Sequence, residues 1–361
     1  GPPDPPLASL EAAVGAPADD GWKLPGSRAG RGAILALVGL ALGLAGALAA
    51  DRLDTRIRGK ADAERAFDLP VIAEIPPLGG TQRGRELLVA TKPASPFVEA
   101  YRALRTVVLF AANEIVGEAH EADGPAEATS NGSGPHHAKV ILVTSPAAGE
   151  GKTTTAAHLA AVLAEGDRRV LVISADFRRP RIHEYFDVPR EPGLSDVLDP
   201  GAGRVRLSDL QMTTSFEQVH LLPSGRPVNN PAQLLTESTH LLRAARPLFD
   251  FIVVDTPPLL VANDATELAA VADLVVLVAK ADRTSRDAAR RATELLRRVD
   301  APLLGVVVSA AHDTPTAYGY YRYRYYAEAD QGSGGRRRRK DRSEPVPAAA
   351  MAGEASHAGQ P

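Results

Sequence analysis

The sequence predicts a doubly wound α/β domain with a mostly parallel sheet over residues 91–317. Two observations carry this prediction. Short runs of apolar, often β-branched residues recur along this segment, and stretches with helical periodicity separate them. The runs are continuous and do not alternate apolar with polar residues, which is typical of strands buried on both faces between helix layers. The expected strands are Val140–Val143, Val170–Ile173, Phe251–Val254, Leu274–Val278 and Val306–Val308.

A glycine-rich loop after the first of these runs has the chemistry of a phosphate site and indicates a P-loop NTPase domain. It leads into a helix expected over Thr153–Ala164. Glycines let main-chain amides curl around phosphate oxygens, and a helix N-terminus adds further amides. Lys152 is expected to contact the β- and γ-phosphates of ATP, although Pro146 stands where the generic motif has glycine. The expected nucleotide-binding residues are Gly149, Glu150, Gly151, Lys152, Thr153 and Thr154.

Two aspartates follow predicted strands and are expected near the phosphates. Asp255 ends the run Phe251–Val254, and Asp176 comes shortly after the run Val170–Ile173. The carboxyl ends of parallel strands meet at one edge of a sheet, where such proteins bind Mg²⁺ and phosphate. We therefore expect Thr153, Asp176 and Asp255 to hold Mg²⁺, and Lys152, Asp176 and Asp255 to be catalytic. The alternative for Asp255 is a residue that caps a turn at the strand end.

An 18-residue stretch, Ala33–Ala50, contains only Ala, Gly, Leu, Ile and Val. As a helix it would be about 27 Å long, enough to span the hydrocarbon core of a bilayer. We therefore expect one transmembrane helix over residues 31–50, with a buried core helix as the alternative. Arginine and lysine are somewhat more frequent after this stretch than before it, which predicts that the following chain lies in the cytoplasm.

Three other segments have weaker patterns. Residues 1–30 are rich in Pro, Gly, Ala and Asp, and we expect an extracytoplasmic or disordered lead-in. Residues 51–90 are expected to form a cytoplasmic juxtamembrane segment. An amphipathic helix is expected over Pro96–Ala112, and a flexible insert without apolar periodicity is expected over residues 113–137.

Six of the eight tyrosines fall within nine residues of the C-terminal tail, residues 318–361, which we expect to be flexible. Two arginines lie between them, and a basic run, Arg336–Lys340, follows. An exposed group of phenols indicates that the hydroxyls are used, so we interpret them as phospho-acceptors; an edge strand and a surface that stacks on RNA are the alternatives. The net charge of −3 does not indicate a nucleic-acid partner. The tyrosines are Tyr318, Tyr320, Tyr321, Tyr323, Tyr325 and Tyr326.

Together, the phosphate loop, the two acids, the sequence Thr256-Pro257-Pro258 and the tyrosine-rich tail resemble bacterial tyrosine kinases (BY-kinases) of exopolysaccharide and capsule synthesis. The resemblance covers about residues 25–326. The apolar stretch followed by Leu53–Ile57 and Leu69–Val71 is similar to the end of a Wzz-type chain-length determinant, which precedes the kinase in fused members. The resemblance implies an ATP-dependent autokinase that phosphorylates its tail in trans and regulates polysaccharide polymerisation and export.

The same resemblance implies partners and a location. In the family, a Glu-x-x-Arg-x-x-Arg helix joins subunits into a ring, and here Glu99, Arg102 and Arg105 match that motif. The alternative is a salt-bridged helix face, since these residues lie along one side of a helix. Further implied partners are the membrane, the polysaccharide polymerase and export machinery, and a phosphotyrosine phosphatase. The implied location is the bacterial inner (plasma) membrane, with the kinase domain in the cytoplasm.

The sequence departs from the family pattern at Ser174, where the family usually has the first aspartate of a second acidic motif. This departure keeps open a nucleotide-binding co-polymerase scaffold that transfers no phosphate. A partition- or division-site-type P-loop ATPase shares the expected fold and is another alternative. Those ATPases usually carry an additional lysine early in the phosphate loop, where Ala147 stands in this chain.

Overall fold

The computed structural model describes residues 27–78, 86–122, 137–198, 212–262 and 264–311. The chain divides into two compact units, Gly1–Thr55 and Arg56–Pro361, which are described one at a time. The predicted tyrosine cluster and basic run, almost all of the lead-in and most of the predicted insert lie outside the described residues, so the expectations for them stay predictions.

The first unit contains one long helix, α1 (Arg28–Leu53), which includes the stretch predicted as a membrane span. Within the described residues, its segment Arg28–Leu48 is the single stretch long and apolar enough to cross a membrane, with a mean hydropathy of 1.9. Its leucines are exposed, for example Leu35 at 72% and Leu40 at 69%. Exposed leucines along Arg28–Leu48 do not fit the alternative of a buried core helix.

The second unit is built on an eight-stranded sheet with the order β1-β8-β7-β2-β6-β3-β5-β4. Neighbouring strands are parallel throughout, except for the antiparallel pair β4 and β5. The doubly wound, mostly parallel architecture is therefore confirmed. The strands are β1 (Val71–Ile75), β2 (Lys139–Thr144), β3 (Val170–Ser174), β4 (Met212–Thr213), β5 (Val219–Leu222), β6 (Phe251–Asp255), β7 (Leu274–Lys280) and β8 (Leu303–Ser309).

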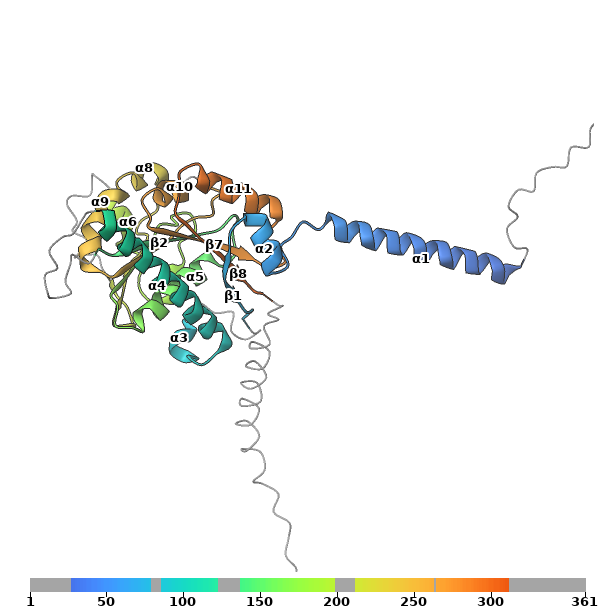
Figure 1. Ribbon diagram of the computed structural model, residues 1–361, viewed down its shortest axis with the longest axis horizontal. Coiled ribbons are helices and arrows are strands. Elements are labelled where there is room, and N and C mark those ends of the chain that lie inside the picture. Colours follow the sequence, from blue (N-terminus) through green and yellow to red (C-terminus); the bar gives the residue numbers. More distant parts are fainter. Residues whose placement is uncertain (1–26, 79–85, 123–136, 199–211, 263, 312–361) are drawn as a thin grey trace, which may run out of the picture. The chain divides into compact units, whose positions relative to one another are not determined.

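Helices cover both faces of this sheet (Figure 1). Successive side chains of a strand point to opposite faces, so Val140 and Leu142 of β2 join one apolar cluster and Ile141 and Val143 join the other. The layer over Ile141 contains α3 (Leu88–Thr91), α4 (Pro96–Ala122), α5 (Lys152–Ala164) and the 3₁₀ turn η3 (Ile182–Tyr185). The opposite layer contains α2 (Lys60–Phe67), α6 (Leu194–Leu198), α8 (Pro231–Leu235), α9 (Ser238–Ala245), α10 (Asp264–Ala269) and α11 (Arg286–Arg297). The 3₁₀ turn η4 (Arg246–Leu248) follows α9 directly.

The segment before residue 91 belongs to this domain, which corrects the predicted boundary. β1 pairs with β8 and forms the edge of the sheet, and α2 packs on α11. Ile57, Phe67 and Ile75 are all at most 1% exposed. The domain therefore extends upstream of the predicted boundary at residue 91, and the compact unit begins at Arg56. The physical reason is that β8 would otherwise present an unpaired strand edge and bare apolar side chains. The expected cytoplasmic juxtamembrane position of residues 51–90 stays a prediction.

The helix α4 also differs from its prediction. It continues to Ala122, whereas the expected flexible insert begins at residue 113. The segment beyond Ala112 lacks apolar periodicity, but it contains good helix formers such as glutamate and alanine, which extend a helix whose first turns are already packed.

Candidate active site

The phosphate loop lies at the carboxyl end of β2 and leads directly into α5. Gly149 has φ of +79° and Gly151 has φ of +101°, in the left-handed region that glycine adopts without strain. A Cβ atom on Gly151 would lie 3.3 Å from Ser309 Oγ, so a larger residue has little room there. The loop backbone therefore has the curled form that presents amides and a helix N-terminus to phosphate oxygens.

The buried side chain of Glu150 stabilises this loop through two hydrogen bonds. One of its carboxylate oxygens accepts from the amide of Ala147 and the other from Thr284 Oγ1, both at 2.6 Å. The side chain is 1% exposed, and burial raises the pKa of its carboxyl. Glu150 was predicted to bind nucleotide; the inward side chain leaves its main-chain amide as the group it can offer to a phosphate.

The predicted catalytic residues lie together beside the loop. Lys152 Nζ donates to Asp176 Oδ2 at 2.7 Å, and Thr153 Oγ1 donates to Asp255 Oδ1 at 3.2 Å. Asp176 is 1% exposed, and Asp255 is fully buried. These four residues come from α5 and from the ends of β3 and β6, which are brought together because the three elements meet at one edge of the sheet.

The charges of this cluster are coupled. Burial is the main reason that the pKa of the Asp255 carboxyl is raised to about 6; Lys152 opposes this rise, and the nearby Asp176 carboxylate adds to it. Burial also works against the charge of Lys152, but the carboxylates of Asp255 and Asp176 outweigh it and hold the pKa of the ammonium above its usual value. Lys152 is therefore a protonated cation that lies among two carboxylates.

Two buried oxygens at this site have no hydrogen-bond partner among the described residues, Asp255 Oδ2 and Ser174 Oγ. A buried polar atom without a partner costs about 1–3 kcal/mol, and such atoms indicate a place for a ligand. The Thr153 hydroxyl and the Asp255 carboxylate are oxygen donors of the kind that Mg²⁺ prefers. Groups of three or more His, Cys, Asp or Glu side chains that could hold a metal are absent from the described part of the chain. The donors therefore fit a metal ion that binds together with phosphate.

Comparisons with known proteins identify the family. Residues 138–302 match an AAA domain, which agrees with a nucleotide-binding loop at 149–154. The tyrosine-protein kinase YwqD of Bacillus subtilis (strain 168) is 31% identical over 245 residues, which cover 67% of this chain and 93% of YwqD. The chain belongs to the family of bacterial tyrosine kinases.

Solved structures agree with this assignment to the bacterial tyrosine kinases. The kinase domain of the Escherichia coli tyrosine kinase ETK matches with a TM-score of 0.59 and 28% identity, covering 72% of this chain and 96% of that domain. The chimerical protein CapA2B2 matches with a TM-score of 0.56 and 27% identity, over 70% of this chain and 98% of the chimera. EpsB of Ralstonia solanacearum is 32% identical over 79% of this chain, and the chain spans about a third of its length, 36%.

Some residues of this bacterial tyrosine kinase that position the site were not predicted from sequence. The amide of Arg179 donates to Asp176 Oδ1 at 3.0 Å, and Arg178 forms an ion pair of 3.5 Å with the buried Asp264 at the start of α10. The guanidinium of Arg283 lies against the loop: a Cβ atom added to Gly149 would be 3.2 Å from it. The contacts of Arg178 and Arg283 join residues far apart in the chain, so local patterns carry no signal for them.

An aromatic cluster of Tyr101, His158 and Tyr185 packs at α5, the helix that follows the phosphate loop. The hydroxyls of Tyr185 and Thr154 lie 2.7 Å apart, and those of Tyr101 and Thr155 lie 3.4 Å apart. The ring of Tyr101 stacks on His158, with centroids 5.1 Å apart. Burial lowers the pKa of His158 to about 4, so its imidazole is neutral at physiological pH. Thr154 was predicted to bind nucleotide; its hydroxyl contacts Tyr185, which leaves its main-chain amide as the group it can offer to a phosphate.

The predicted oligomerisation motif makes contacts within its own chain. Arg102 Nε donates to Glu165 Oε2 at 2.9 Å, Arg105 donates to the same oxygen at 3.0 Å, and Arg102 also pairs with Glu99 at 2.7 Å. Hydrogen bonds from Arg102 lower the pKa of the Glu165 carboxyl. Glu165 is the C-cap residue of α5, so these contacts tie α4 to the helix that begins at the phosphate loop.

Proposed function

We propose that this protein is an ATP-dependent protein-tyrosine kinase that phosphorylates its own C-terminal tyrosines, at positions 318, 320, 321, 323, 325 and 326. The observation that carries the proposal is the buried pair of Lys152 and Asp176 beside the phosphate loop, with 2.7 Å between Nζ and Oδ2. The pair supplies a cation for phosphate and a carboxylate for a phenol proton in one place. The likeness to named tyrosine kinases supports the same conclusion.

The ion pair explains how nucleotide binding prepares the reaction. A bound triphosphate attracts the Lys152 ammonium, which frees Asp176 Oδ2 to accept a hydrogen bond from an incoming phenol. The phenol oxygen forms a bond to the γ-phosphorus, the bond from that phosphorus to the β–γ bridging oxygen breaks, and the phenol proton passes to Asp176. A base is useful because the pKa of a free tyrosine is about 10.

Thr153 and Asp255 are the residues that would hold Mg²⁺ in this reaction. Asp176, which was also expected at the metal, is assigned to the phenol proton because it pairs with Lys152. When bound, the ion supplies positive charge to the phosphate oxygens. Asp255 Oδ2 fits this role because it is buried and lacks a partner among the described residues. Thr153 donates to the other oxygen of the same carboxylate, which fixes the orientation of Asp255.

The proposal extends to assembly and location. The tail of one subunit enters the site of its neighbour in a homo-oligomeric ring, with Glu99, Arg102 and Arg105 on the helix that joins subunits. The exposed apolar α1 anchors the chain in the bacterial inner (plasma) membrane, with the kinase domain in the cytoplasm. As the C-terminal part of a fusion to a Wzz-type region, the kinase controls exopolysaccharide or capsule polymerisation and export, and a phosphotyrosine phosphatase resets it. No nucleic-acid partner is needed.

A specific observation favours one alternative, a nucleotide-binding scaffold. Ser174 replaces an aspartate of the family motif, and its buried Oγ has no partner among the described residues. A nucleotide-binding scaffold without phosphotransfer would tolerate that loss of a carboxylate.

Mass spectrometry of the full chain after incubation with Mg-ATP tests the proposal. We expect phosphotyrosine within residues 318–326, and none in Lys152→Met, because that variant loses the cation for the phosphates. Release of ADP without phosphotyrosine would instead support an ATPase. The absence of both products, with nucleotide still bound, would support the scaffold.

A further inference from the structure

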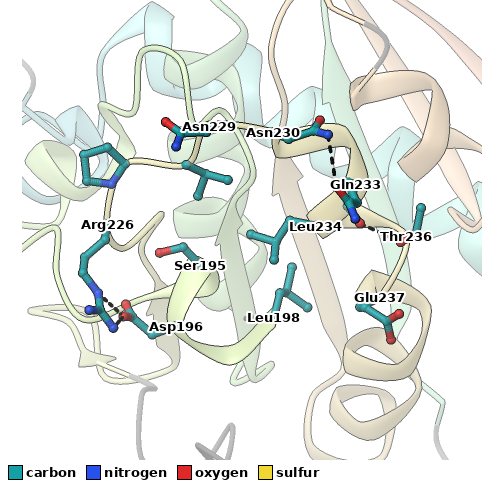
Figure 2. Close-up of a pocket in the computed structure, with 12 residues that line it drawn as sticks. Ser195, Asp196, Leu198, Arg226, Asn229, Asn230, Gln233, Leu234, Thr236 and Glu237 are labelled. Carbon is teal, nitrogen blue, oxygen red and sulfur yellow. Dashed lines mark hydrogen bonds and ion pairs between the residues drawn. The ribbon is translucent and has the colours of Figure 1, made fainter. Parts of the chain in front are cut away.

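A cavity of about 530 Å³ lies beside α6 and α8, in the same unit as the phosphate loop. Figure 2 shows Ser195, Asp196 and Arg226 on one side of it and Gln233, Thr236 and Glu237 on the other, with Leu198 and Leu234 between them. Small-molecule sites commonly have volumes of about 300–1,000 Å³. The cavity is therefore large enough for a side chain of a bound peptide, and the phosphate chemistry described above does not use it.

The lining combines apolar walls with a buried polar group that lacks a partner. Leu198, Val228 and Leu234 supply the apolar walls. Ser195 is 6% exposed, and its Oγ has no hydrogen-bond partner among the described residues. Asp196 is also 6% exposed, but it is satisfied by the amide of Gly193 at 2.8 Å and by Arg226. This pattern suits a ring with a hydroxyl at one end, because buried tyrosines pack their ring on apolar atoms and hydrogen-bond through the phenol.

The cavity lies at the same edge of the sheet as the phosphate loop. Its loop wall, residues 226–230, follows the carboxyl end of β5, and the phosphate loop follows the carboxyl end of β2. In the order β2-β6-β3-β5, three strand intervals separate the two ends. With neighbouring strands about 4.8 Å apart, the carboxyl ends of β2 and β5 are roughly 14 Å apart, and we take this separation as the scale of the distance from the phosphate loop to the cavity. β8 is parallel to β7 and β2, so the chain also leaves its last strand towards this edge.

The tyrosines of the tail have a spacing that matches this distance. An extended chain advances about 3.3 Å per residue, so residues four or five apart are separated by roughly 13–17 Å. Tyr321 and Tyr325 are four positions apart, and Tyr318 and Tyr323 are five apart. Arg322 and Arg324 lie between tyrosines, and Glu237 at the cavity offers a complementary carboxylate.

We propose that this cavity docks one tyrosine of the tail while another tyrosine, four or five positions away, occupies the phosphate site. The docked ring packs on Leu198, Val228 and Leu234, and its hydroxyl bonds to Ser195 Oγ. This inference rests on the proposed kinase function and adds to it a rule of substrate choice: acceptor tyrosines are selected by the presence of a second tyrosine four or five positions away.

Peptides that cover residues 316–328 test the rule. The enzyme is the full chain in detergent with its six tail tyrosines changed to alanine, so that its own rings do not compete. One peptide keeps Tyr321 and Tyr325, and the matched peptide keeps Tyr320 and Tyr321, with alanine at the other tyrosines of each. We expect the spaced pair to have a KM about five- to tenfold lower at similar kcat, equivalent to one good docking contact. Equal KM values would overturn the docking proposal.

Filling the cavity provides the second measurement. Val228→Trp should remove the advantage of the spaced peptide, because the indole takes the place of the docked ring, while affinity for ATP stays unchanged. Leu248→Trp is the matched control, since Leu248 is 46% exposed in η4 and does not line the cavity. A spaced peptide that keeps its low KM with folded Val228→Trp would contradict the proposal. Failure of the parent chain to phosphorylate any peptide would instead overturn the kinase function on which it rests.

Discussion

Asp255 is a residue at which function and stability oppose each other. Its carboxyl is fully buried, and burial raises its pKa from 3.8 to about 6. The native state therefore binds a proton that the unfolded chain has already released between about pH 4 and pH 6, so the free energy of unfolding falls as the pH rises through this range. Above pH 6 the ligand-free protein holds a buried carboxylate that weakens the fold and that the proposed phosphate chemistry requires.

We predict that Asp255→Asn abolishes phosphorylation yet makes the ligand-free protein more stable at pH 7.5, by about 1–3 kcal/mol, because the pKa shift of about two units is removed. Urea unfolding with a metal chelator, at pH 5 and pH 7.5, measures the effect. The gain should be about half as large at pH 5, which lies midway between the pKa of Asp255 in the unfolded chain and its pKa in the folded protein. A variant that is less stable than the parent at pH 7.5 would show that the carboxylate is stabilised by contacts that outweigh its burial.

Helix α4 acts as a support for the phosphate-loop helix at two places. The hydroxyl of Tyr101 contacts that of Thr155 in the first turn of α5. Arg102 and Arg105 donate hydrogen bonds to Glu165 at the end of α5. The arginines are about one quarter exposed. An element expected to join subunits therefore also determines how α5 sits on the sheet.

We predict that Glu165→Gln lowers the free energy of unfolding by about 0.5–1 kcal/mol, and that Arg102→Ala has a similar effect, since partly exposed ion pairs contribute little more. Glu165 lies outside the Glu-x-x-Arg-x-x-Arg motif, so it separates the two roles of the arginines. Sedimentation should show fewer oligomers for Arg102→Ala and unchanged oligomers for Glu165→Gln. If both variants lose oligomers equally, the arginines act on assembly through α5 and not through direct subunit contacts.

The parts of the molecule that sequence predicted are those whose chemistry is local. A few consecutive residues are enough to recognise the glycine-rich turn before Lys152, and the same is true of strands that are apolar throughout. Asp255 was found in the same way, because it ends such a strand. The pairing of Lys152 with Asp176 was not predicted, since it depends on which strands become neighbours. β1 was missed as a strand of the domain because its short run lies between prolines and its partner, β8, is more than two hundred residues away.

At the scale of the whole molecule, the position of β1 predicts where the catalytic unit can be cut. A chain that begins at Arg56 keeps α2 and β1, whereas one that begins at residue 91 loses both. The second cut removes Ile57, Phe67 and Ile75, each at most 1% exposed. A fully buried side chain of this size contributes about 1.5–3 kcal/mol, and whole domains are stable by only about 5–15 kcal/mol.

We therefore predict that residues 56–361 form a soluble, cooperatively unfolding protein that binds ATP, and that residues 91–361 aggregate or unfold at a much lower temperature. The shorter chain also exposes the edge of β8, which is then free to pair with other chains. Light scattering and thermal unfolding of the two chains, purified side by side, measure the difference. If the chain from residue 91 were as stable as the chain from Arg56, β1 and α2 would be an attachment to the domain and not part of its core, and the phosphate site would not depend on them.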